Sequence, residues 1–114
     1  MRSTRAWKLS PWLIRILLPV RVSGSYLLGA PRPTGNGFEV TYVGRSDKDL
    51  RRRLLEHCAA GKASLFKFQP HKNATEAFLS ECYLWHATRE DGRNENIIHP
   101  APPTAGRISC PYCS

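Results

Sequence analysis

The chain has 114 residues, of which 41% are hydrophobic and 23% are charged, and its formal net charge is +8. This length allows one compact domain, and the composition is that of a globular chain and excludes wholesale disorder. The basic excess favours a polyanionic partner, either nucleic acid or an anionic membrane surface. No acidic residue precedes Glu39, so most of the excess lies near the N-terminus, as in a nucleic-acid arm, a targeting segment or a solvated tail.

Residues 1–21 are predicted to form a basic N-terminal extension. Within it, Ser10-Pro11 is typical of the start of a helix, and apolar residues then recur at helical spacing up to Pro19. We therefore expect a short amphipathic helix. Its apolar stretch is interrupted by Arg15 and is far too short to span a bilayer, so no membrane partner is predicted.

The next residues predict two strands, Ser25 to Leu28 and Phe38 to Val43, joined by a loop rich in glycine and proline. A helix from about Asp47 to Ala60 follows, then a short strand from Leu65 to Phe68 and a second helix from about Ala74 to Ala87. Strands that alternate with helices in this order indicate an α+β domain, with a three-stranded antiparallel sheet flanked by helices.

Glu81 is out of place in the second of these helices. Helical periodicity puts it within the apolar arc, whereas Glu76 falls on the opposite side, which faces solvent. A buried carboxylate without a partner is costly. Two interpretations remain open at this point: Glu81 pairs with an arginine at the margin of the core, or it binds a metal ion.

Arg53 and His57 are four residues apart in the preceding helix and are therefore neighbours on one edge of it. Arg53 ends a run of three arginines that starts at Arg51. The run is either a solvated surface or a binding site for phosphate, a group that guanidinium side chains bind well. Tyr26 and Tyr42 lie on neighbouring predicted strands. They either pack in the core or place two hydroxyl groups around one point.

Two tripeptides, Gly24-Ser25-Tyr26 and Tyr42-Val43-Gly44, resemble the paired tripeptides of the GIY-YIG nuclease superfamily. The resemblance covers about residues 22–98, which we predict to be the nuclease domain. It continues in the family's order through Arg53, His57 and Glu81, and then Asn96, with Asn94 as the alternative for the late asparagine. Ser25 stands where an aliphatic residue is usual, and the loop between the tripeptides is longer than typical.

The resemblance implies an endonuclease that hydrolyses phosphodiester bonds of DNA and depends on Mg²⁺ or Mn²⁺, with Glu81 as the metal ligand. The catalytic residues it implies are Tyr26, Tyr42, Arg53, His57 and Glu81. The predicted substrate-binding residues are Gly44, Arg45, Arg51, Arg52 and Asn96. Because there is no room for a separate recognition domain, we expect low sequence specificity, recognition of DNA structure, or a protein partner that supplies specificity. The alternative is a non-catalytic nucleic-acid-binding module of the same fold.

The cysteine pattern favours a reduced, cytoplasmic protein over a disulfide scaffold. The tail of residues 99–114 is rich in proline and contains Cys110 and Cys113 in a C-x-x-C motif, which supplies two of the four ligands of a Zn²⁺ site. Cys82, His86 or His99 would be needed to complete the set. A pair of reduced thiols is the alternative, and a third class of function is a structural domain stabilised by this metal.

Overall fold

The computed structural model describes residues 6–32, 37–61, 63–90, 100–101 and 109–112. Its elements follow in the order β1 (Trp7–Lys8), α1 (Pro11–Leu17), β2 (Ser23–Pro31), β3 (Phe38–Ser46), α2 (Leu50–Ala59), β4 (Leu65–His71) and α3 (Ala74–Glu90). The three helices and three strands predicted from the sequence are all present. Each of those strands is longer than its sequence pattern indicates, and β2 runs into the stretch that was expected to be loop.

The strands form one antiparallel sheet in the order β1-β4-β2-β3. The predicted α+β class with an antiparallel sheet is therefore confirmed, but the prediction of three strands is wrong. The additional strand, β1, pairs Trp7 with Phe66 and Lys8 with Leu65. Two residues are too few to produce a recognisable alternation of polar and apolar side chains, so the pattern could not reveal this strand.

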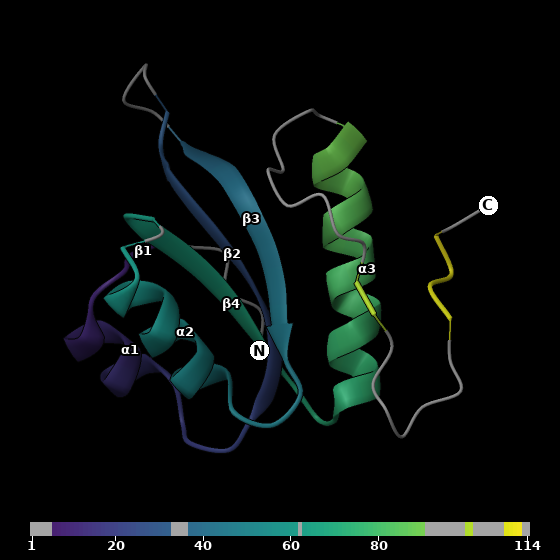
Figure 1. Cartoon of the computed structure of the whole chain (residues 1–114), viewed down its shortest axis with the longest axis horizontal. Helices are drawn as coiled ribbons and strands as arrows, with labels where there is room; N and C mark the ends of the chain where they lie inside the picture. Colours follow the sequence, from purple (N-terminus) through teal and green to yellow (C-terminus); the bar gives the residue numbers. More distant parts are fainter. Residues whose placement is uncertain (1–5, 33–36, 62, 91–99, 102–108, 113–114) are drawn as a thin grey trace.

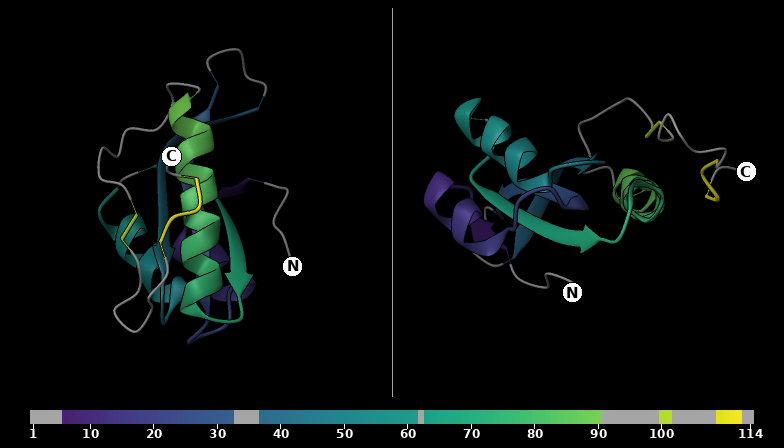
Figure 2. Two further views of the ribbon diagram at one scale, coloured as in Figure 1. Left: turned by 90° about the vertical axis from the view of Figure 1, so that its right-hand side faces the viewer. Right: turned by 90° about the horizontal axis from the view of Figure 1, so that it is seen from below.

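The sheet separates two helical layers, as Figure 1 shows. Helices α1 and α2 cover one face, and α3 covers the other; the view from below in Figure 2 shows the same arrangement. Successive residues of a strand point to opposite faces. Tyr26 of β2 therefore points toward α2, whereas its neighbour Ser25 points toward α3, where it contacts Ser80.

Each helix begins at a capping side chain. Ser10 accepts a hydrogen bond from the Leu13 amide at 3.3 Å, which confirms the predicted start of α1. Helix α2 begins at Leu50 and not at Asp47, because Asp49 is the capping residue and Arg45 holds the Asp47 carboxylate. No helix among the described residues is long and apolar enough to cross a membrane.

The main core lies between the sheet and the layer of α1 and α2. It contains eight buried side chains from four elements and the residues that flank α1: Leu9, Ile14, Leu18, Tyr26, Leu28, Leu50, Leu54 and Phe66. Three of them belong to the segment that the sequence predicts to be an N-terminal extension. This segment contributes a strand, a helix and three buried side chains to the same folded unit as the rest of the described chain.

Candidate functional site

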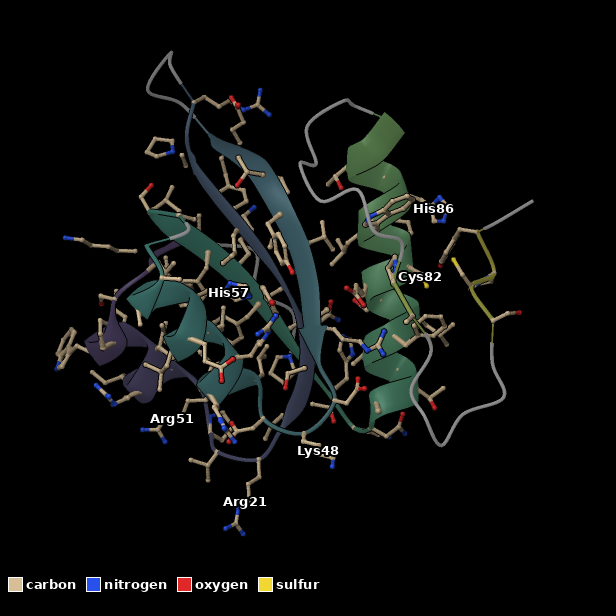
Figure 3. The ribbon with its side chains drawn as sticks, in the orientation of Figure 1. Arg21, Lys48, Arg51, His57, Cys82 and His86 are labelled. Carbon is tan, nitrogen blue, oxygen red and sulfur yellow. The ribbon has the colours of Figure 1, made fainter. Side chains whose placement is uncertain are left out.

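Tyr26 is the centre of a cluster of polar side chains beneath α2. Its side chain is almost completely buried, with 1% exposed, and its hydroxyl is hydrogen-bonded to His57 Nε2 at 2.5 Å. His57 is itself 4% exposed, and Figure 3 shows it on the side of α2 that faces the sheet. Two of the predicted catalytic residues therefore come together from a strand and a helix, although they are 31 residues apart in the sequence.

Tyr42 completes an aromatic group around this hydrogen bond. Its ring centroid lies 6.2 Å from that of Tyr26 and 5.2 Å from that of His57. The Tyr26 and His57 centroids are also 5.2 Å apart. Three of the predicted catalytic residues thus pack against one another, and the two tyrosines come from neighbouring strands, as expected.

Gly44 makes room for the Tyr26 ring. The two residues are directly paired across β2 and β3. A Cβ atom at position 44 would collide with Cζ and the hydroxyl oxygen of Tyr26. Only glycine at this position leaves room for the phenol to lie across the backbone of β3. The glycine of the second tripeptide is thus explained by the tyrosine of the first.

Arg53 lies beside the same phenol, one turn before His57 on α2. Burial, the largest effect, and the neighbouring Tyr42 raise the pKa of Tyr26 well above its ordinary value, while the charge and a hydrogen bond of Arg53 oppose the rise. Tyr26 therefore stays protonated at neutral pH. The Arg53 guanidinium also donates to Glu56 at 3.1 Å and remains partly open to solvent.

Glu81 reaches the site from α3, on the other side of the sheet. It is 9% exposed, which confirms the prediction that it lies at the core or its edge. Arg45 Nη1 donates to Glu81 Oε1 at 3.0 Å, with both side chains almost buried. Among the effects that raise the pKa of Tyr26, the charge of Glu81 is the smallest.

Arg45 is held from three sides. It forms ion pairs with Asp47, at 2.6 Å, and with Glu81, and its guanidinium lies 5.1 Å from the ring centroid of Phe78. Of the two interpretations of Glu81 that the sequence leaves open, the pairing with an arginine is present in the structure. In the structure the Arg45 guanidinium is bound by two carboxylates, those of Asp47 and Glu81. The predicted contact of Arg45 with substrate stays a prediction.

The remaining predicted substrate-binding residues lie away from the cluster or outside the described residues. Arg52 is exposed and pairs with Glu56 at 3.6 Å, and Arg51 is half-buried at the start of α2. Figure 3 shows Arg51 at the same end of the molecule as Arg21 and Lys48. Asn96 and the alternative Asn94 both lie outside the described residues.

A second polar group, on the α3 side of the sheet, was not identified from the sequence. Ser25 Oγ lies 2.8 Å from Ser80 Oγ and 3.1 Å from His71 Nε2, and Ser25 is completely buried. Burial lowers the pKa of His71, and the charge of Glu76 partly opposes this effect. The sequence feature that could have revealed this group is Ser25, because a hydroxyl buried on a central strand requires hydrogen-bond partners.

Within the residues that the structure describes, no group of three or more His, Cys, Asp or Glu side chains is placed to hold a metal ion. Of the predicted zinc pair, Cys110 is described and Cys113 lies outside the described residues. Comparison with known proteins adds no assignment, because no family model, curated protein or solved structure matches the chain.

Proposed function

We propose that this chain is a divalent-metal-dependent endonuclease of the GIY-YIG type. Its substrate is DNA, whose phosphodiester bonds it hydrolyses with low sequence specificity or according to DNA structure. The observation that carries the proposal is the assembly of Tyr26, Tyr42 and His57 around one hydrogen bond, with Arg53 one turn before His57 on α2. Three elements, β2, β3 and α2, build this assembly, and α3 supplies Glu81.

In this proposal Tyr26 orients the attacking water and is not its base. Its pKa lies above the ordinary value, so the phenol is neutral and offers one donor and one acceptor. The bond to His57 fixes the direction of the hydroxyl. Arg53 stabilises the negative charge that develops on the phosphoryl oxygens, for which its planar fork of donors is suited.

Glu81 is the residue that would hold the metal ion. A single carboxylate suits Mg²⁺, which keeps several water ligands and takes the remainder from phosphate oxygens. When bound, the ion supplies Lewis-acid stabilisation of the phosphate and the leaving oxygen. Arg45 orients the carboxylate through its 3.0 Å hydrogen bond and lowers the cost of keeping it almost buried.

The test is a plasmid-nicking assay with Mg²⁺ that compares the wild type with Glu81→Gln, Arg53→Ala and Tyr26→Phe. Glu81→Gln keeps an oxygen acceptor for Arg45 but removes the charge. Each variant is expected to cut about 100-fold more slowly or worse, the usual loss for one catalytic group. The matched control is Glu76→Gln, an exposed position on the same helix, which should cut at the wild-type rate. Full cleavage by Glu81→Gln would refute the metal assignment.

The second candidate is a DNA-binding module without catalytic activity, and one observation favours it. Glu81 forms an ion pair with Arg45, and that pair is a sufficient reason for a carboxylate at this position. Under this alternative the wild type binds labelled DNA but cleaves no DNA or RNA substrate with Mg²⁺ or Mn²⁺. The same nicking assay, with a binding measurement beside it, therefore separates the two functions.

A further inference from the structure

The side of α1 that faces away from the core carries large apolar side chains at its surface. Trp12 is 70% exposed, Ile16 is 60% exposed and Val20 is 56% exposed. Trp12 and Ile16 are neighbours one helical turn apart, and Val20 follows at the same spacing just beyond the end of the helix. The other large hydrophobic side chains exposed in the described part of the chain, Tyr83 and Tyr112, lie together at α3. We call Trp12, Ile16 and Val20 the outer apolar face.

The fold does not account for the outer apolar face. Ile14 and Leu18, from the buried side of the same segment, already place their side chains in the main core. A helix that only had to cover this core would carry polar residues on its outward side. Monomeric proteins rarely leave several large apolar side chains together at the surface without a partner that covers them.

The surroundings of the outer apolar face are basic. Arg15 of α1 and Arg21, just beyond the helix, are both exposed. No acidic residue precedes Glu39, so the segment that contains β1 and α1 carries positive charge only. Figure 3 shows Arg21 at the same end of the molecule as Arg51. A partner that covers this face must therefore be both apolar and negatively charged.

The backbone is strained where the outer apolar face ends. Arg21 has a φ of 60°, and it is the one non-glycine residue in the described part of the chain with a positive φ. A residue with a side chain adopts this left-handed conformation at a cost, and such positions are concentrated at functional sites. The turn leaves Val20 and Arg21 exposed, so it presents an apolar and a basic side chain together.

Two other occupants fit this face less well. A second copy of the chain would bring the same basic surface, and like charges disfavour that contact. The neighbouring helix α2 does not offset the charge, because its Glu56 carboxylate is paired with Arg52 and Arg53. DNA phosphates would engage the arginines but would leave Ile16 and Val20 without an apolar contact.

We propose that the outer apolar face of α1 binds the surface of an anionic lipid membrane. Tryptophan is favoured at the boundary between headgroups and acyl chains, where Ile16 and Val20 also find apolar surroundings. Arg15 and Arg21 then contact the anionic headgroups. The expectation that the chain has no membrane partner rests on the length needed to span a bilayer, and a helix that lies in the interface needs no such length.

The core prepares α1 for this contact. A free amphipathic peptide of this length is not a stable helix in water and has to fold as it binds. Here Ile14 and Leu18 hold the helix in place through the core, so no ordering of the helix opposes binding. Because the apolar face is small, the attachment should be reversible and should require both its apolar and its basic side chains.

The experiment measures sedimentation of the full-length protein with vesicles of mixed phosphatidylcholine and phosphatidylserine, and with vesicles of phosphatidylcholine alone. The mixed vesicles should bind the protein at least about tenfold more tightly. Trp12→Ala and Ile16→Ala should each weaken binding to mixed vesicles by about fivefold or more. Arg15→Gln should weaken it by about fivefold, the value for one basic side chain near an anionic surface.

Tyr83→Ala is the matched control. It removes an exposed aromatic side chain from α3, on the other face of the sheet, and should bind mixed vesicles as the wild type does. The proposal is overturned if the wild type does not sediment with mixed vesicles, if it binds both kinds of vesicle equally, or if Trp12→Ala binds them as tightly as the wild type.

The other occupants give distinct outcomes. A dimer in analytical ultracentrifugation without lipid that Trp12→Ala dissociates would assign the face to a second copy of the chain and overturn the proposal. The same holds for DNA if Trp12→Ala weakens the binding of a labelled duplex and leaves vesicle binding unchanged. None of these readouts depends on DNA cleavage, so the proposed nuclease activity is tested separately.

Discussion

At the residue scale, Tyr26 determines how the site is built. Its hydroxyl bonds to His57, its ring stacks on Tyr42, and its edge occupies the space that Gly44 leaves empty. The environment that binds this phenol also keeps it protonated. Tyr26 is therefore both a core residue and a residue of the candidate site. A substitution at His57, Tyr42 or Gly44 should change the surroundings of its hydroxyl group.

The contact between Gly44 and Tyr26 gives a prediction about stability. Gly44→Ala should destabilise the fold by about 1–3 kcal/mol, because the added methyl group displaces the Tyr26 ring. In a Tyr26→Leu background, which lacks the atoms that collide, Gly44→Ala should cost much less. Urea unfolding of the wild type, both single variants and the double variant measures this coupling. Effects that add within about 0.5 kcal/mol would show that the two positions do not clash.

Glu81 shows how much of the site a sequence can predict. The period of one helix was enough to place its carboxylate at the edge of the core, and the structure confirms this. The identity of its partner was not accessible, because Arg45 comes from a strand 36 residues earlier. Periodicity reports the direction of a side chain within its own element. The residue that meets it is decided by how the elements pack together.

At the scale of the elements, α1 is more than the accessory arm that its charge suggests. Its pattern of apolar residues predicted a helix, and capping by Ser10 confirms where it begins. The pattern could not show that this helix packs against α2 and places Ile14 in the main core. An amphipathic helix predicts that one face will be buried without naming the surface that buries it.

Two isoleucines of α1 test its place in the core. Ile14 is completely buried, whereas Ile16, on the same helix, is 60% exposed. Ile14→Ala should lower the free energy of unfolding by about 2–5 kcal/mol, because it leaves a cavity beneath the helix. Ile16→Ala removes the same atoms and should change stability by less than about 0.5 kcal/mol. Chemical denaturation measures both, and equal effects would place α1 outside the core.

At the scale of the whole molecule, some of the basic side chains behind the net charge of +8 are concentrated in one region. The side chains of Arg21, Lys48 and Arg51 gather at one end, around the start of α2, as Figure 3 shows. Arg21 and Lys48 are exposed. A concentrated patch of this kind is better suited to a run of DNA phosphates than the same charge spread evenly.

Two exposed lysines provide a matched test of this patch. Lys48→Gln should weaken DNA binding and reduce the slope of log affinity against log salt by about one, the value for one lost phosphate contact. Lys8→Gln makes the same change on β1, at the opposite edge of the sheet from β3, and should leave the slope unchanged. Fluorescence anisotropy of a labelled duplex over a range of salt concentrations gives both slopes. Equal slopes for the two variants would mean that Lys48 contacts DNA phosphates no more than Lys8 does.

The position of β1 in the sheet also constrains the order of events during synthesis. The partner of Trp7 is Phe66, so β1 has no strand to pair with until nearly sixty more residues have been synthesised. Ile14 and Leu18 belong to the core that also contains Phe66 of β4, so their burial is complete only after β4 has been made. Residues 7–18 are therefore made before the strand that completes their packing, and part of the apolar surface of α1 stays uncovered on the nascent chain until then.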